Sequence, residues 1–95
     1  MTEEMLRTVL ETAQAKADKD GTTALPEGRH MTLYAAHAGV GLTVGKVERL
    51  RIAQGTVRAR TAKGETFVFA LEDVFAAAIE GGSEAAMSRK AGFLG

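Results

Sequence analysis

Residues 46–74 alternate apolar and polar side chains with a period close to two, and this pattern constrains the fold more than any other feature of the sequence. Such alternation is typical of β-strands that bury one face and expose the other. Gln54-Gly55 and Gly64 interrupt the run. We therefore predict three antiparallel strands joined as a meander. The chain has 95 residues, a length that suits one domain with a modest core.

The first turn of this meander sets the register of its first two strands. A hairpin centred on Gln54-Gly55 places Ile52 opposite Val57 and Leu50 opposite Ala59. Apolar side chains then meet on one face of the sheet, which we predict to be the core face.

The second turn has two readings. A two-residue loop would pair Arg60 with Phe67, whereas a three-residue loop over residues 62–64 pairs Ala59 with Phe67 and gathers the apolar side chains on one face. Because a slip of one residue moves every side chain to the other face, we predict the three-residue loop. Gly64 then takes the left-handed position of a bulge, where a side chain is unfavourable.

The same register gathers positive charge on the opposite face. It places Arg51 opposite Arg58 and Arg49 opposite Arg60, and directly opposed like charges destabilise a sheet by roughly 0.2–1 kcal/mol per pair. Three arrangements can offset this cost: water around splayed side chains, an acidic segment of the same chain, or an external anionic partner. The predicted anion-binding residues, with two flanking lysines, are Lys46, Arg49, Arg51, Arg58, Arg60 and Lys63.

The N-terminal residues 3–19 have the pattern of an amphipathic helix. Thr2 is a suitable N-cap, and two glutamates follow in the first turn. The apolar stripe either packs on its own domain or docks on a partner or on a second copy. The partner-facing residues would be Met5, Leu6, Val9 and Leu10. We expect an exposed linker over residues 20–29.

Residues 30–80 are predicted to form the main domain. The segment 30–37 alternates as a strand, and a phase break near Glu48 indicates a bulge or a bend. Residues 71–79 fit either a helix or a strand; we favour a strand after a turn at 71–74, with Phe75, Ala77 and Ile79 on one face. The expected fold is mainly β (α+β): a small bent antiparallel meander that closes into a small barrel behind an N-terminal helix. Residues 81–95 are expected to be a flexible tail.

Chemistry-bearing patterns are few. The chain contains no cysteine, and His30 and His37 lie on opposite sides of one predicted strand without a carboxylate cluster at ligand spacing. Glu72 and Asp73 are adjacent and would point apart in a strand. No phosphate-binding glycine loop is present. We therefore predict a protein that is not an enzyme, has no catalytic residues and holds neither a metal nor another cofactor.

The sequence lacks an apolar run of the roughly 18 residues that a membrane span needs. Its first residues are acidic, unlike those of a secretory signal peptide. With no cysteine to form disulfides, these features favour a cytoplasmic protein without membrane contact.

The segment Phe69-Ala70-Leu71-Glu72-Asp73-Val74 resembles the leucine–acidic–acidic–valine turn that precedes the last strand in small barrels of the SH3, Sm or PRC type. The resemblance covers about residues 30–80. It implies a small barrel, and because such folds host RNA binding, peptide binding and scaffolding, it selects none of these functions.

The sequence therefore predicts a non-enzymatic adaptor that binds an acidic surface or peptide of another protein. A nucleic-acid binder is the alternative, although Phe67 and Phe69 fall on the core face and leave the basic face without an aromatic side chain for stacking. A third reading is a barrel that binds a small effector molecule. Self-association into a homo-oligomer stays open.

Overall fold

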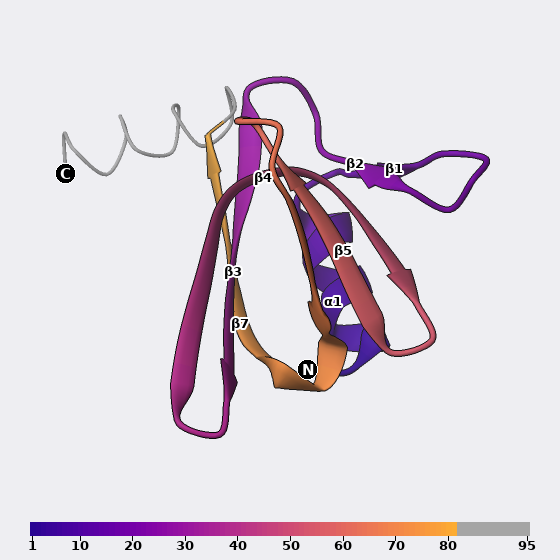
Figure 1. Ribbon diagram of the computed structural model, residues 1–95. Helices are drawn as coiled ribbons and strands as arrows, with labels where there is room; N and C mark the ends of the chain where they lie inside the picture. Colours follow the sequence, from indigo (N-terminus) through magenta and orange to yellow (C-terminus); the bar gives the residue numbers. More distant parts are fainter. Residues whose placement is uncertain (82–95) are drawn as a thin grey trace, which may run out of the picture.

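A computed structural model describes residues 1–81 of the chain. Within this range one helix precedes a sheet and a single 3₁₀ turn (Figure 1). The elements are α1 (Glu3–Thr12), β1 (Lys16–Ala17), β2 (Thr23–Ala24), β3 (Arg29–His37), β4 (Val40–Ala53), β5 (Thr56–Thr61), β6 (Thr66–Ala70), η1 (Leu71–Asp73) and β7 (Val74–Gly81). The predicted tail of residues 81–95 lies outside the described residues, apart from Gly81 at the end of β7.

The strands of residues 16–81 form one antiparallel sheet, which curls strongly into an open half-barrel. β4 is the long strand that makes the curl possible, and Figure 1 shows it arching from the β3 hairpin across to β5. Its first half pairs with β3 and its second half with β5, while β2 joins it at Arg49 and Leu50. No ladder joins β6 to β7 in the described part of the chain, so one side of the barrel stays open. The predicted mainly β fold is confirmed.

The predicted register of the meander is confirmed at both turns. Ile52 lies opposite Val57 and Leu50 opposite Ala59. The second turn is the three-residue loop: Ala59 lies opposite Phe67, and the Thr61 amide donates to the Glu65 carbonyl at 2.9 Å. Gly64 has a φ of 86°, the left-handed conformation expected there.

The phase break in β4 is a bulge at Glu48, as predicted. Val47 pairs with Thr61 and Arg49 pairs with Arg60, so Glu48 is the extra residue between two ladder positions. Its carbonyl accepts a hydrogen bond from the amide of Leu25 at 2.9 Å. The bulge thus turns the strand and also holds the segment that follows β2.

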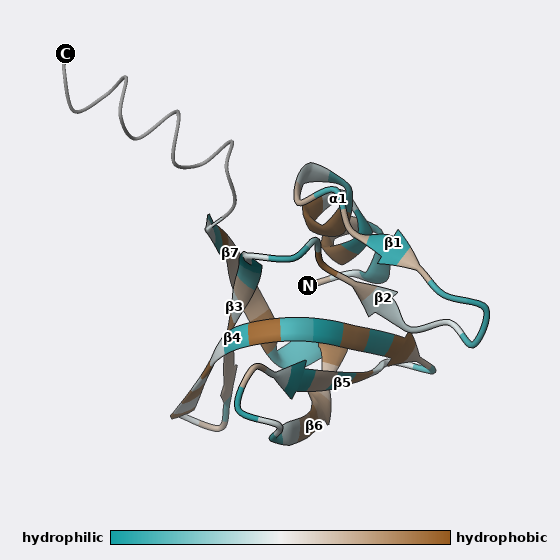
Figure 2. Ribbon diagram, turned by 90° about the horizontal axis from the view of Figure 1, so that it is seen from above, coloured by the Kyte–Doolittle hydropathy of each residue, from teal (hydrophilic) through white to brown (hydrophobic). Residues whose placement is uncertain are grey.

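Helix α1 belongs to the core of this domain. The Thr2 side chain accepts a hydrogen bond from the Met5 amide at 3.1 Å, which confirms the predicted N-cap. Leu6 and Leu10 are buried, and both views show α1 lying against the curled sheet (Figures 1 and 2). The buried core residues that pack together are Leu6, Leu10, Met31, Leu33, Ala35, Val44, Val47, Leu50, Val57, Ala59, Leu71 and Val74.

The predicted length of the helix, residues 3–19, is wrong. The helix ends at Thr12, and Gln14 has a φ of 62°, which takes the chain off the helical path. Residues 16–17 then pair with Ala24 and Thr23 as a short hairpin. The apolar stripe continues in the sequence beyond residue 12, but strand pairing with β2 replaces the helix there.

The predicted exposed linker over residues 20–29 is right only in part, because residues 20–21 and 26–28 are exposed but the rest of the segment is not. β2 extends the sheet beside β4, and Thr22 to Leu25 are partly buried. The segment ends at Arg29, which starts β3 and is only 8% exposed. The turn residues of this stretch therefore form a structured part of the domain.

The last predicted element, a strand after a short turn, is confirmed as η1 followed by β7. Ala77 and Ile79 face the core side and are partly buried. Phe75 is an exception to the predicted face, because a register shift opposite Tyr34 and Ala35 gives the inward position to Val74. Phe75 is 66% exposed, and its ring centroid lies 6.3 Å from that of Tyr34.

Candidate functional site

Four guanidinium groups share the outer surface of β4 and β5, and we call Arg49, Arg51, Arg58 and Arg60 the arginine face. Arg49 lies opposite Arg60 and Arg51 opposite Arg58, as the register predicts, and all four side chains are exposed. The alternate residues of the same strands point inward, and Figure 2 shows the matching alternation of hydropathy along β4. Strict alternation is therefore what gathers the positive charge.

The arginine face is hollowed rather than flat. A cavity of about 270 Å³ is lined by all four arginines together with Asp20, Thr22, Leu50 and Thr66. A second hollow of about 390 Å³ continues from Arg51 and Arg58 toward Ala53 and Thr56. No ion pair joins any of these arginines to a carboxylate within residues 1–81. The groups are thus accessible to an anion from outside.

One acidic residue of the chain approaches this surface. Asp20 lies in the loop between β1 and β2, where its carboxylate accepts a hydrogen bond from the Thr22 amide at 3.0 Å. That hydrogen bond, with the nearby positive charge of Arg51 as a further cause, holds the pKa of Asp20 below its ordinary value. A Cβ placed on Gly21 would lie 3.8 Å from Nε of Arg51, so the loop passes beside this arginine.

The sequence pattern does not predict this neighbour, because it indicates a helix end and a linker in this loop. The available signal was the pair of aspartates just before Gly21. In the described residues Asp20 covers only part of the arginine face, because it forms no ion pair there and all four arginines stay exposed.

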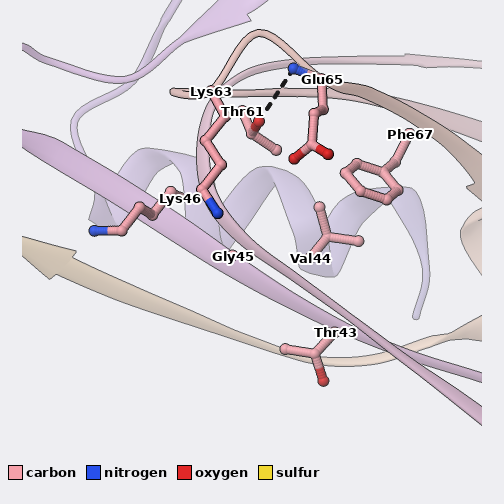
Figure 3. A pocket seen from close by; sticks show the side chains of 8 residues that line it. All are labelled: Thr43, Val44, Gly45, Lys46, Thr61, Lys63, Glu65 and Phe67. Atoms are coloured by element: carbon pink, nitrogen blue, oxygen red, sulfur yellow. Dashed lines mark hydrogen bonds between the residues drawn. The ribbon is translucent and has the colours of Figure 1, made fainter.

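The two flanking lysines of the predicted set lie apart from the arginines. Lys46 and Lys63 line a separate cavity of about 310 Å³, together with Glu65 and Phe67 (Figure 3). This cavity shares no lining residue with the one at the arginine face. Figure 3 shows the Glu65 carboxylate beside the Phe67 ring and the Lys46 ammonium pointing away from both. The structure therefore divides the predicted cluster into an arginine face and a lysine cavity.

The helix residues predicted to face a partner are mostly covered by the chain itself. Leu6 and Leu10 are buried and Val9 is partly buried against the core, whereas Met5 is 56% exposed. The helix therefore packs on its own domain, and Met5 is the most exposed of the four residues.

The aromatic side chains of the meander lie on its inner face. Phe67 and Phe69 are partly buried against the core, as the register predicts. On the outer face, β6 places Thr66 opposite Arg60 and Val68 opposite Arg58. Val68 is 59% exposed, so the arginine face borders an aliphatic side chain there.

The two histidines lie in the described part of the chain, where their surroundings can be compared with those of a metal site. Residues 1–81 hold no group of three or more His, Cys, Asp or Glu side chains placed to bind a metal ion. His37 Nδ1 instead lies 3.1 Å from the Asp73 carboxylate. This hydrogen bond and the negative charge of Asp73 raise the pKa of His37 above its ordinary value.

No protein-family model matches this chain, and no curated protein or solved structure matches it. A search of the described helices finds none long and apolar enough to cross a membrane.

Proposed function

We propose that this chain is a non-enzymatic interaction module that binds an acidic surface or peptide of another protein through the arginine face. The observation that supports it most is the pairing of four exposed arginines, none of which forms an ion pair with a carboxylate of residues 1–81. Directly opposed like charges cost roughly 0.2–1 kcal/mol per pair, and an anionic partner removes that cost.

Arginine suits an acidic protein surface for a geometric reason. Its planar guanidinium group donates two parallel hydrogen bonds to one carboxylate, and such charge-assisted bonds are roughly twice as strong as neutral ones. The hollow between the four side chains lets a carboxylate approach more than one of them. Thr22 and Thr66 at its margin add hydroxyl groups for further polar contacts.

A protein partner is favoured over a nucleic acid because of what surrounds the arginines. Binders of single-stranded nucleic acid combine a basic groove with aromatic side chains on which bases stack. Here Phe67 and Phe69 lie on the inner side of the meander, and the exposed neighbour in β6 is Val68. The basic surface therefore offers charge without a stacking platform among the described residues.

The test compares a glutamate-rich peptide with a single-stranded oligonucleotide of equal charge, each titrated at several salt concentrations. We expect tighter binding of the peptide at physiological salt. A phosphate ligand loses affinity with a slope of about −0.7 in log K per phosphate contact, because it releases condensed counterions. The peptide, with its carboxylates spaced apart by threonines, holds fewer condensed counterions, and we expect a shallower slope for it.

Two variants make this test specific. Replacement of all four residues of the arginine face by serine should abolish peptide binding, whereas Arg7→Ser, an exposed change on α1, should leave it unchanged. Circular dichroism of each variant confirms that the fold is kept. Tighter binding of the oligonucleotide, or equal binding by the serine variant, would contradict the proposed function.

A further inference from the structure

The four arginines are arranged in two cross-strand rows, with the regular spacing of an antiparallel β-sheet. Arg49 and Arg60 form one cross-strand row, and Arg51 and Arg58 form the next. Opposed residues of an antiparallel pair have Cβ atoms about 4.5–5.5 Å apart. The two rows are separated by two residues along each strand, a spacing of roughly 6.6–6.8 Å.

Each row is suited to one carboxylate. A carboxylate accepts about four hydrogen bonds through its two oxygens, and a guanidinium group donates in pairs. Two arginines on opposite strands can therefore share one carboxylate between them, which also cancels their mutual repulsion. Two rows would therefore bind two carboxylates, separated by the same roughly 6.6–6.8 Å as the rows.

An extended peptide provides that spacing. Side chains at positions i and i+2 of a β-strand point to the same face and stand roughly 6.6–6.8 Å apart. We propose that the arginine face binds an extended acidic segment whose carboxylates stand two residues apart, one to each arginine row. This inference rests on the proposed function and specifies the form of its partner.

Asp20 occupies part of the same site and acts as a built-in competitor. It lines the cavity that all four arginines line, and its loop passes beside Arg51. A partner carboxylate that approaches the row of Arg51 and Arg58 meets this negative charge. Removal of the charge therefore strengthens binding, while asparagine at this position keeps an oxygen for the Thr22 amide.

The experiment uses two peptides of threonine and glutamate with equal length and equal glutamate content. Both peptides carry the same number of glutamates, which stand two residues apart in one peptide and three residues apart in the other, and threonines at the ends make the lengths equal. Fluorescence anisotropy measures their dissociation constants for the full chain. We expect the first peptide to bind at least about fivefold more tightly, the ratio that corresponds to one additional exposed ion pair.

The variants separate this inference from the proposed function. Asp20→Asn should tighten binding of the alternating peptide by about two- to fivefold, on the scale of one exposed charge pair. Asp18→Asn, a change in the same loop, should leave it unchanged. Equal affinity for the two peptides overturns the extended-segment inference and leaves a general acidic partner standing. No effect of Asp20→Asn overturns the competing role of Asp20. If the unaltered chain binds neither peptide but does bind the oligonucleotide, the proposed function is overturned as well.

Discussion

The guanidinium group of Arg29 donates a hydrogen bond from Nη1 to the main-chain carbonyl of Ala13 at 2.9 Å. The same nitrogen lies 3.3 Å from the side-chain oxygen of Gln14. Ala13 is the C-cap of α1, and Arg29 is the first residue of β3. This contact therefore fixes the end of the helix to the sheet across the hairpin that separates them.

Replacement of Arg29 by methionine should destabilise the domain. It keeps an apolar stem but removes a charged donor from a buried carbonyl, which costs about 1.5–3 kcal/mol. Urea unfolding of the two proteins measures the difference. The control is Arg7→Met, an exposed change on α1 that should stay within about 0.5 kcal/mol of the unaltered protein. Equal effects of the two changes would show that the Arg29 contact carries no stability.

Leu6→Ala should lower the free energy of unfolding of the whole domain. Leu6 is fully buried in the shared core, and truncation of such a leucine costs about 2–5 kcal/mol. Its neighbour Met5 is exposed, so Met5→Ala should change stability by less than about 0.5 kcal/mol. Chemical denaturation followed by circular dichroism measures both. If Leu6→Ala proves as mild as Met5→Ala, α1 does not contribute to the core.

Gly64→Ala should be more damaging than its open surroundings suggest. No atom lies within 4 Å of a Cβ built there, but φ is +86°, a conformation that costs an L-residue about 1–2 kcal/mol. Gly64→Val should cost more, because branching at Cβ tightens the same restriction. Gly41 in β4 is also in open space and lacks the left-handed φ. Gly41→Ala is therefore the matched control, and thermal unfolding should show it neutral or mildly stabilising.

Arg58→Gln should stabilise the fold at low salt while it weakens binding of the acidic peptide. It removes one directly opposed pair of like charges, which is worth roughly 0.2–1 kcal/mol. The gain should shrink as salt rises, since the screening length falls to about 3 Å at 1 M. Urea titrations at two ionic strengths measure it. A gain that does not depend on salt would indicate a cause other than repulsion.

The pair of His37 and Asp73 should make a small contribution to stability that depends on pH. Because the folded-state pKa of His37 is raised, this contribution is fully present below about pH 6.5, the ordinary value, and is lost as pH rises through the raised pKa. An NMR titration of the His37 ring should show a midpoint above that ordinary value. Asp73→Asn should lower the midpoint.

The control for this titration is Glu72→Gln. Glu72 contributes only through its charge and is the weakest of the causes that raise the pKa of His37, so its replacement should lower the midpoint less than Asp73→Asn does. An unchanged midpoint in Asp73→Asn would show that the hydrogen bond is absent in solution.

The meander was predictable because the polarity of each side chain indicates whether it faces the core or the solvent. Only one register of residues 49–69 puts Leu50, Val57, Ala59 and Phe67 together, and the structure has that register. The bulge at Glu48 was equally visible, since the spacing from Val47 to Leu50 breaks the alternation. The same pattern predicts the arginine face, because the arginines alternate with the core residues and therefore point to the opposite side of the sheet.

The segment between α1 and β3 was not predictable from periodicity. Strands of two residues, such as Lys16–Ala17 and Thr23–Ala24, are too short to alternate. They are held instead by contacts distant in sequence, such as the hydrogen bond from Leu25 to the bulge at Glu48. The approach of Asp20 to the arginine face depends on this hairpin, so it was missed with it.

The division of the cationic cluster was missed for a different reason. Nearness in sequence predicts that the two flanking lysines lie beside the arginines. Lys46 precedes the bulge and has a φ of 55°, and Lys63 lies in the turn after β5. Neither position continues the outward alternation of the strands. The two lysine side chains therefore do not lie beside the arginine face.

In residues 49–60, alternate side chains point to opposite faces of the sheet. Their inward side chains hold the half-barrel together, while their outward side chains meet solvent. Substitutions at the four outward sites therefore leave the packing of the interior untouched. A protein with this hairpin can therefore change its binding specificity by substitutions at those four sites, while its fold stays the same.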